Sequence, residues 1–544
     1  MFQYDFIIIS QSELVDYNKY SSLPLERLPL YKKLVYPRMV YYKNRFISHL
    51  DLLNQLTFNQ GWSDASCIER RKLFSIWNLP GFVGTNLATY LAEYNIKTFI
   101  INNFDAEWDL FCEKYNNSYI KPLVGISTTF HLNYSEITRL VKQLKQTYPN
   151  VSIVLGGAFI NNQLQLKKQK SLMDFMKKYS IDFTIHNFNS DADLKNLILR
   201  KKYPKNNDML NNLITNTKQN DHFIPTKPTY PPQTSNNRSK RQQTLKFPFM
   251  HHTLQLRTSS GCPFHCAFCS YPGLAEHYNT MPIYAVEQQL QAAHSNKKIK
   301  NIIFIDDTFN VPIKRFKKIC QILSNYNFNW FSFLRVQFID ENTAKLMKQS
   351  GCQAVYLGIE SANNKILKNM NKQATQQEYI RGINYLKKYN ITIMAAFVIG
   401  FPGETPDTLQ DNIDFIENLD IDFYTLKEFF YIKNTAIYQQ RENHGLTGIG
   451  SSWSHNTMNS DEAYDHKISM LKQIKNSIFI DPDTSLWYIA YLFDRGFSME
   501  KIASLQKEIN TVMIAQINGD FNNTSTYKRL IDKINCRHFQ NVDK

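Results

Sequence analysis

Three cysteines within eight residues are the best candidates for chemistry in this chain. Cys262, Cys266 and Cys269 have the spacing C-x3-C-x2-C and directly follow a strand-like segment. Three thiolates can each bind one iron of a cubane cluster, which leaves the fourth iron open to another ligand. A closed zinc site would need a fourth Cys or His, and His265 is nearby. Ligands this crowded rarely close a tetrahedron, so we expect a [4Fe–4S] cluster.

Four later segments place polar residues or glycines at the ends of predicted strands. They are residues 303–309 with Asp306 and Asp307, 333–335 with Arg335, 358–361 with Glu360 and Ser361, and 397–405 with Gly400 and Glu404. Each segment alone is more readily explained by a structural role, such as a helix cap or a turn. Together and in this order, they predict a ligand site along the carboxyl edge of a parallel sheet.

The cysteine spacing, with an aromatic residue just before the last cysteine, resembles the radical S-adenosylmethionine (SAM) superfamily. This resemblance implies that the open iron binds the amino and carboxylate groups of SAM, whose reductive cleavage gives a 5′-deoxyadenosyl radical. The four later segments also match the family pattern. The SAM-binding residues implied in this way are Phe268, Glu360, Ser361, Arg335, Gly400 and Glu404.

Apolar strand-like segments alternate with amphipathic helices over residues 251–435. The predicted strands are 254–259, 301–305, 330–336, 354–359, 391–399 and 424–431, and the predicted helices are 285–294, 314–325, 341–348, 375–388 and 408–418. Six such repeats in fewer than 200 residues predict a partial (β/α)6 barrel, the radical SAM core, with its chemistry at the carboxyl ends of the strands.

A second alternation, over residues 71–200, predicts a doubly wound, Rossmann-like parallel sheet. The predicted strands are 72–79, 97–102, 123–127, 152–155 and 183–186. Such a domain before a radical SAM barrel resembles the cobalamin-binding class of the family. The resemblance implies cobalamin contacts by Pro80, Gly81, Ser127, Thr128, Gly156 and Gly157. No D-x-H-x-x-G motif follows the first strand, so no axial histidine is carried over, and His131 is an alternative without support from the motif.

Composition sets the remaining boundaries. Residues 1–70 form an unassigned N-terminal segment, and residues 201–250 form a linker or insertion rich in Pro, Asn and Lys. Residues 436–544 form a mainly helical C-terminal region. The expected fold class is therefore α/β, with a Rossmann-like cobalamin domain, a partial barrel and this C-terminal region.

Further strings resemble the cobalamin-dependent radical SAM P-methyltransferases of phosphinothricin-type biosynthesis. They are residues 256–264, 269–272, 306–312, 330–335 and 453–458. This resemblance implies radical methylation of an unactivated carbon, or of a phosphinate phosphorus, in a small molecule. Arg257 and Arg335 are the candidates for holding an anionic substrate.

Two other classes of function stay open. One is a cobalamin-associated radical SAM enzyme that catalyses a non-methylating rearrangement or cyclisation, or that modifies RNA or a peptide. The other is a non-enzymatic iron–sulfur or zinc-binding protein. Methyl transfer from labelled SAM separates the first from a methyltransferase, and iron content with SAM cleavage separates the second from any radical enzyme.

Most of the net charge of +16 is interpreted as a solvated surface rich in Lys and Asn. It also suits an acidic electron donor of the flavodoxin or ferredoxin type. No nucleic-acid-binding signature stands out, so nucleic acid is not an expected partner. The apolar runs are shorter than the ~20 residues of a membrane-spanning helix, and the N-terminus lacks a secretory pattern. We therefore expect a cytoplasmic protein that does not bind a membrane.

Overall fold

The computed structural model divides the chain into two compact units, which we describe separately. The Rossmann-like unit contains Met1–Val15 and Trp77–Phe249, and the barrel unit contains Asp16–Ile76 and Met250–Lys544. The residues that the structure describes are 3–11, 18–36, 38–49, 52, 81–129, 131, 133–186, 191–202, 213–215, 252–275, 277–480, 485–494, 496–521 and 528–529. The predicted strand 72–79 and the predicted cobalamin contact Pro80 lie outside the described residues.

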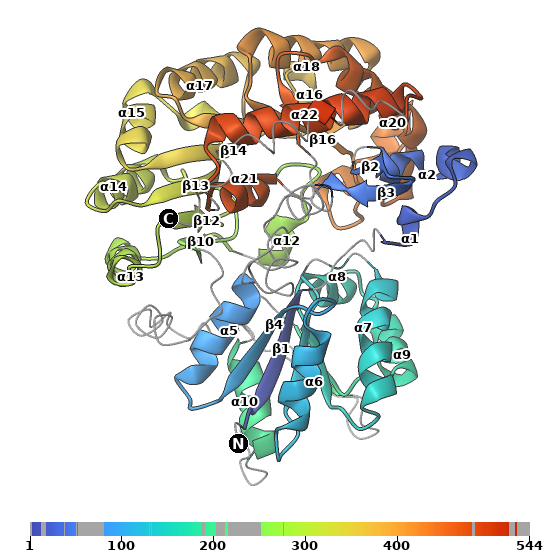
Figure 1. Ribbon diagram of the computed structural model, residues 1–544, viewed down its shortest axis with the longest axis vertical. Coiled ribbons are helices and arrows are strands. Elements are labelled where there is room, and N and C mark those ends of the chain that lie inside the picture. Colours follow the sequence, from blue (N-terminus) through green and yellow to red (C-terminus); the bar gives the residue numbers. More distant parts are fainter. Residues whose placement is uncertain are drawn as a thin grey trace. The chain divides into compact units, whose positions relative to one another are not determined.

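The Rossmann-like unit is built on a sheet with the strand order β4-β1-β5-β6-β7-β8. Figure 1 labels its neighbouring strands β4 and β1. The first five strands in this order are parallel, and β8 pairs antiparallel with β7. The strands are β1 (Phe6–Gln11), β4 (Thr98–Asn103), β5 (Leu123–Ser127), β6 (Ile153–Gly156), β7 (Phe183–Ile185) and β8 (Leu213–Thr215). Because β1 lies between β4 and β5, the winding reverses there, and ligands of such sheets bind beside this switch point at the carboxyl edge.

Strand β1 shows why both faces of this sheet are covered. Its side chains alternate between the two faces. Ile7 and Ile9 belong to the core beneath α6–α9, whereas Phe6 and Ile8 belong to the core beneath α5 and α10. The helices are α5 (Phe82–Ala92), α6 (Trp108–Asn116), α7 (Tyr134–Thr147), α8 (Ala158–Gln165), α9 (Gln169–Lys178) and α10 (Asp191–Lys202). This confirms the predicted doubly wound sheet.

Two strands of this sheet come from segments that the sequence left unassigned. Strand β1, an interior strand between β4 and β5, lies in the N-terminal segment 1–70, and β8 lies in the predicted linker 201–250. An all-apolar run such as FIII suits a buried central parallel strand, but periodicity alone does not separate it from a buried helix. Strand β8 has three residues, which is too short for a periodic signal.

The barrel unit is built on seven parallel strands in the order β9-β12-β13-β14-β15-β16-β20. The strands are β9 (Thr253–Leu256), β12 (Asn301–Phe304), β13 (Asn329–Leu334), β14 (Cys352–Glu360), β15 (Thr392–Ile399), β16 (Phe423–Glu428) and β20 (Ile478–Phe479). All six predicted strands are present, and β20 adds a seventh from the C-terminal region. The predicted partial barrel is therefore confirmed.

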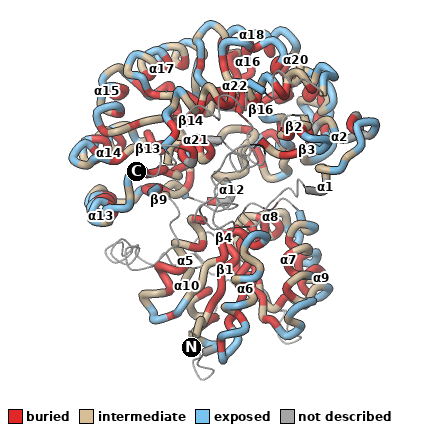
Figure 2. Tube along the Cα trace, in the orientation of Figure 1, coloured by how far each residue is buried: buried red, intermediate tan, exposed pale blue. Residues whose placement is uncertain are grey.

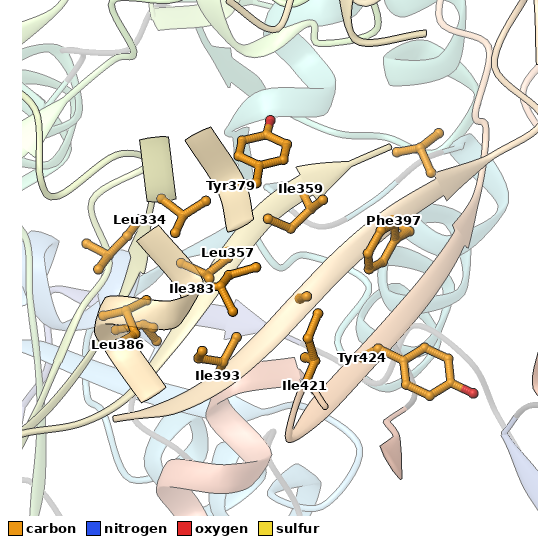
Figure 3. Packing of buried hydrophobic residues seen from close by; sticks show 14 of the residues in the cluster. Leu334, Leu357, Ile359, Tyr379, Ile383, Leu386, Ile393, Phe397, Ile421 and Tyr424 are labelled. Atoms are coloured by element: carbon orange, nitrogen blue, oxygen red, sulfur yellow. The ribbon is translucent and has the colours of Figure 1, made fainter. Parts of the chain in front are cut away.

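Helices that connect consecutive strands cover one face of this sheet. They are α13 (Ile283–Ser295), α14 (Ile313–Leu323), α15 (Glu341–Gln349), α16 (Asn364–Asn369), α17 (Gln376–Lys388) and α18 (Pro406–Leu419). Their inward side chains interdigitate with those of the strands, as Ile383 and Leu386 of α17 do with Leu357 and Ile393 (Figure 3). In Figure 2 these strands are coloured as buried, while the outer faces of the helices are exposed.

The C-terminal helices complete the barrel unit. Helix α21 (Ser485–Asp494) packs on the other face of the sheet, where Trp487 and Phe493 contact the rings of Phe333 and Phe331. Helix α22 (Met499–Ile517) packs against β20 and the hairpin of β2 (Met39–Tyr42) and β3 (Arg45–Ser48). No helix among the described residues is both long and apolar enough to cross a bilayer.

Candidate functional site

The three cysteines lie in the loop that follows β9, at the carboxyl end of the barrel sheet. Gly261 has a φ of +79°, and a Cβ there would collide with the carbonyl oxygen of His277, so the loop needs glycine at this turn. The Ala267 amide donates to Met370 O at 2.8 Å, and its carbonyl accepts from Ile437 N at 2.9 Å. The loop is therefore fixed by segments after β14 and β16.

The cysteine side chains are half-buried and unpaired as disulfides. Cys262 Sγ lies 3.5 Å from Thr308 Oγ1, and Cys266 Sγ accepts a hydrogen bond of 3.1 Å from Arg335 Nη2. The pKa of Cys269 is raised to about 12, mainly by burial, and the nearby thiols of Cys266 and Cys262 contribute in the same direction. The three sulfurs are thus electrostatic neighbours.

This donor set fits a [4Fe–4S] cluster. Each thiolate of a cubane binds a different iron, so the sulfurs surround the cluster rather than meet at one point. His265, which could have closed a zinc site, is exposed. Among the residues that the structure describes, no group of three or more His, Cys, Asp or Glu side chains is placed to hold a single metal ion.

The two carboxylates after β12 have different roles. Asp306 is fully buried and accepts hydrogen bonds from the backbone and side chain of Thr258 and from Ser259, so it fixes the start of the cysteine loop. Asp307 is partly exposed, with its carboxylate 3.8 Å from Arg257 Nη2. Burial raises the pKa of both carboxyls. Neither caps α14, whose N-cap is Pro312.

Glu360 ends β14 in an unusual backbone conformation. Its φ is +66°, and the pairing register of β14 shifts between Gly358 and Glu360. The side chain forms an ion pair with Lys372, in which Nζ lies 2.9 Å from Oε1. The next residue, Ser361, is fully buried, and its hydroxyl accepts from Asn363 N at 3.1 Å. Strained backbone of this kind is common where side chains are held for a ligand.

The loop after β15 is held by contacts within the protein. Glu404 is fully buried and accepts from the Gly400 amide, and burial raises its pKa to about 8. Gly400 has a φ of +86°, and a Cβ there would meet Trp453. The Trp453 ring stacks on His455, whose Nε2 lies 3.1 Å from Gly400 O. The other predicted SAM residue, Phe268, packs edge-on against Phe401.

The described residues that were predicted to contact cobalamin lie together at the carboxyl edge of the Rossmann-like sheet. Thr128 donates from its amide and hydroxyl to Gly156 O, at 2.7 and 2.9 Å. The Ser127 hydroxyl lies 3.1 Å from that of Thr129, and the Gly81 amide donates to Asn102 Oδ1 at 3.0 Å. Gly157 has a φ of +114°, which favours glycine. The edge is therefore built from small and hydroxyl residues.

His131 lies at the same edge, four residues after β5. It is 5% exposed, and neither ring nitrogen has a hydrogen-bond partner among the residues that the structure describes. Burial, followed by the charge of Arg139, lowers its pKa to about 4, so the imidazole is neutral near pH 7. An orphaned polar group of this kind is uncommon in a folded core and is compatible with a bound ligand.

Comparison with known families identifies part of the chain. Residues 256–416 match the model of the radical SAM superfamily, and this segment spans β9 to α18 with all three cysteines. Residues 256–416 form a radical SAM domain. Such domains use a [4Fe–4S] cluster and SAM, which agrees with the cofactors expected from the cysteine loop.

Individual proteins extend this similarity beyond the radical SAM domain. An uncharacterised methyltransferase of Pyrococcus horikoshii, PH0819, is 30% identical over 309 residues, which are 55% of this chain and 65% of that protein. The chain thus spans just under two thirds of the length of this relative. Among solved structures, the radical SAM methyltransferase TsrM of Kitasatospora setae has a TM-score of 0.53 at 15% identity, over 67% of this chain and 74% of that one.

A third comparison covers both units of the chain. The cobalamin-dependent SAM radical enzyme OxsB has a TM-score of 0.51 at 14% identity, over 94% of this chain and 85% of that one. At such identities the similarity concerns the fold alone. It agrees with a Rossmann-like unit that precedes a radical SAM domain.

Sequence reasoning missed several residues around the radical SAM site. Lys372 pairs with Glu360 from 12 positions along the chain, and the Tyr271 hydroxyl lies 3.4 Å from both Arg257 Nη2 and the Gly261 amide. Asn310 exchanges two hydrogen bonds with the backbone of Arg335. A lone Lys in a loop, or a Tyr at the start of a short helix, carries no spacing signal. Asn310 lies within the string 306–312, which contributed to the family resemblance without a role for Asn310 itself.

Proposed function

We propose that the protein is a cobalamin-dependent radical SAM methyltransferase that acts on a small molecule. The observation that carries this proposal is the fixed loop with Cys262, Cys266 and Cys269 at the carboxyl end of a radical SAM sheet. The second support is the Rossmann-like unit, whose strand order creates a ligand-binding switch point beside β1 and β5. The methyltransferase relative and the fold similarity to TsrM agree with it.

In this proposal the three cysteines hold the cluster through thiolates. Glu360, Phe268, Ser361, Gly400 and Glu404 border or shape the SAM site. When bound, the cluster and SAM supply a radical that removes hydrogen from the substrate, and cobalamin supplies the methyl group.

The chain's own residues orient these groups and protect them. Glu360, held by Lys372, offers a carboxylate to a cationic amino group. The buried loop after β15 limits access of water, which matters because water and stray hydrogen donors quench radicals.

The cobalamin site is proposed at the carboxyl edge of the Rossmann-like sheet. Ser127, Thr128, Gly156 and Gly157 line this edge, with Gly81 at the start of α5. Small residues let a large planar macrocycle and its nucleotide tail approach the backbone. The ring nitrogens of His131 have no hydrogen-bond partner in the described part of the chain, which supports a ligand at this edge.

The substrate class is a finer proposal. Strings such as Trp330–Arg335 resemble the P-methyltransferases of phosphinothricin-type biosynthesis, and an anionic phosphinate would suit a basic site. Arg257, about a quarter exposed and beside Asp307, is the better candidate for holding it, because the Arg335 guanidinium contacts Cys266. The single electron that starts the reaction is proposed to come from an acidic flavodoxin- or ferredoxin-type protein, which would suit the net charge of +16.

The test uses the full chain, purified and reconstituted without oxygen. We expect four irons per chain, reductive cleavage of SAM to methionine and 5′-deoxyadenosine, and a visible spectrum that changes on cobalamin titration. Labelled methyl from SAM should appear in a phosphinate or carbon acceptor. Cobalamin binding and SAM cleavage without methyl transfer would support the non-methylating alternative. SAM cleavage without cobalamin binding would refute the methyltransferase proposal and leave the radical chemistry intact, and zinc without SAM cleavage would refute the enzymatic proposal altogether.

A further inference from the structure

A buried cation stands beside the cysteine loop. Arg335 follows β13 and is 5% exposed. Its backbone is fixed by Asn310, which accepts from the Arg335 amide at 3.0 Å and donates to its carbonyl at 2.8 Å. Its guanidinium donates to Lys372 O at 3.0 Å, and its central carbon lies 3.6 Å from the centre of the Phe264 ring. Contacts with Asn310, Lys372 and Phe264 therefore fix the position of the guanidinium.

This cation has no carboxylate partner within the part of the chain that the structure describes. The carboxylate of Glu360 is paired with Lys372, whose Nζ lies 2.9 Å from Oε1. Burying a guanidinium without an opposite charge is strongly unfavourable. The acceptor that faces its second nitrogen, Nη2, is Cys266 Sγ, at 3.1 Å. A thiolate at this sulfur, as in a cluster-bound cysteine, would supply the missing negative charge.

We propose that Arg335 is a positioning residue that acts through Cys266, as the counter-ion of the cluster, and that it raises the cluster's reduction potential. This inference rests on the proposed ligation of the cluster by Cys266. Reduction adds one electron from an external donor, and the cluster becomes more negative by one unit of charge. A fixed cation and an N–H···S hydrogen bond stabilise the reduced form more than the oxidised form. Because Lys372 O and Cys266 Sγ already occupy its guanidinium, we do not assign Arg335 to holding the substrate.

The experiment is a redox titration of the reconstituted full chain with dithionite as reductant, followed by the electron paramagnetic resonance signal of the reduced cluster. The variants are R335Q, which removes the charge, and R335K, which keeps it without the fork of nitrogens. The control is R381Q, which makes the same change of charge on the exposed face of α17. Iron and sulfide content is measured first.

We expect the midpoint potential of R335Q to be more negative than that of the wild type, with R335K between them and R381Q unchanged. Equal potentials for R335Q and the wild type, with full clusters in both, would overturn the inference and leave the proposed function intact. A wild type without iron would overturn both.

If R335Q loses the cluster, the R335K variant still tests the inference. Retention of the cluster by R335K alone supports a role for the charge. Loss from both variants, despite a folded chain in each, would overturn it in favour of a packing role against Phe264.

Discussion

Lys372 Nζ lies 2.9 Å from Glu360 Oε1, and the two side chains are 5% and 15% exposed. The pair forms where the backbone of Glu360 has a φ of +66°, a conformation that costs a non-glycine residue on the order of 1–3 kcal/mol. The ion pair therefore fixes the Glu360 side chain at the C-terminal end of β14, where the backbone is strained. This explains how the end of β14 can present Glu360 in one orientation.

The first prediction concerns this pair. K372M should destabilise the chain by about 3 kcal/mol, because it leaves a mostly buried carboxylate without its cation. The free energy of unfolding in urea, measured for the wild type and the variant, checks this. The double variant E360Q/K372M should recover part of the loss, since no unpaired charge remains. A double variant as unstable as K372M alone would show that the loss comes from packing of the lysine stem.

The second prediction concerns the cluster ligands. C269A should lose most of its iron on anaerobic reconstitution, because two thiolates hold a cubane poorly. C352A is the matched control, since Cys352 is a fully buried cysteine in β14 outside the cysteine loop. Its replacement should lower stability through a small cavity and leave four irons per chain. Equal iron contents in the two variants would contradict the assignment of the cluster to the loop.

The barrel could be predicted from the sequence because its strands are apolar and are separated by amphipathic helices. Strand β15, with eight residues, shows this well. The two-residue strand β20 and the three-residue strand β8 have no such pattern, because their pairing depends on neighbours that are distant in the sequence. The apolar composition of β1 suits a buried strand. Its position in the sheet is set by β4 and β5, which come later in the chain and pair with it.

The site was predictable to the extent that its residues share a motif. The cysteine spacing led to the radical SAM domain, and the strand-end position of Glu360 followed from the alternation of elements. The contact between Arg335 and Cys266 joins residues 69 positions apart and depends on how β13 and the cysteine loop face each other. The sequence suggested a ligand role for Arg335 and Glu404, and it gave no indication of the internal contacts that hold both.

The third prediction concerns pH. Burial raises the pKa of Glu404 to about 8, above its ordinary value of 4.5, so the folded state binds a proton that the unfolded state releases. Stability from this group is complete below about pH 4.5 and is lost as the pH rises to about 8, by at most about 1.4 kcal/mol per pH unit. E404Q removes this titration while keeping an acceptor for the Gly400 amide. The variant should therefore gain stability relative to the wild type between pH 5 and pH 8, as measured by urea unfolding. A difference that is constant across this range would refute the prediction.

The fourth prediction separates folding from ligand binding at the edge of the Rossmann-like sheet. A Cβ at Gly157 would lie 2.9 Å from Thr129 N in a backbone with φ of +114°, whereas a Cβ at Gly156 would meet Ile185 O at an ordinary 3.5 Å. G157A should therefore destabilise the unit by about 1–3 kcal/mol. G156A should fold like the wild type.

If cobalamin approaches the backbone at this edge, the methyl group of G156A should weaken its binding about tenfold or more, which corresponds to about 1.4 kcal/mol. The measurement is a cobalamin titration followed by the visible spectrum, with the melting temperature of each variant recorded in parallel. G273A is a control in the other unit, where a Cβ would also meet its nearest neighbour at 3.5 Å. Unchanged cobalamin affinity in G156A would place the macrocycle away from β6, because a bound corrin in contact with that backbone has no room for the added carbon.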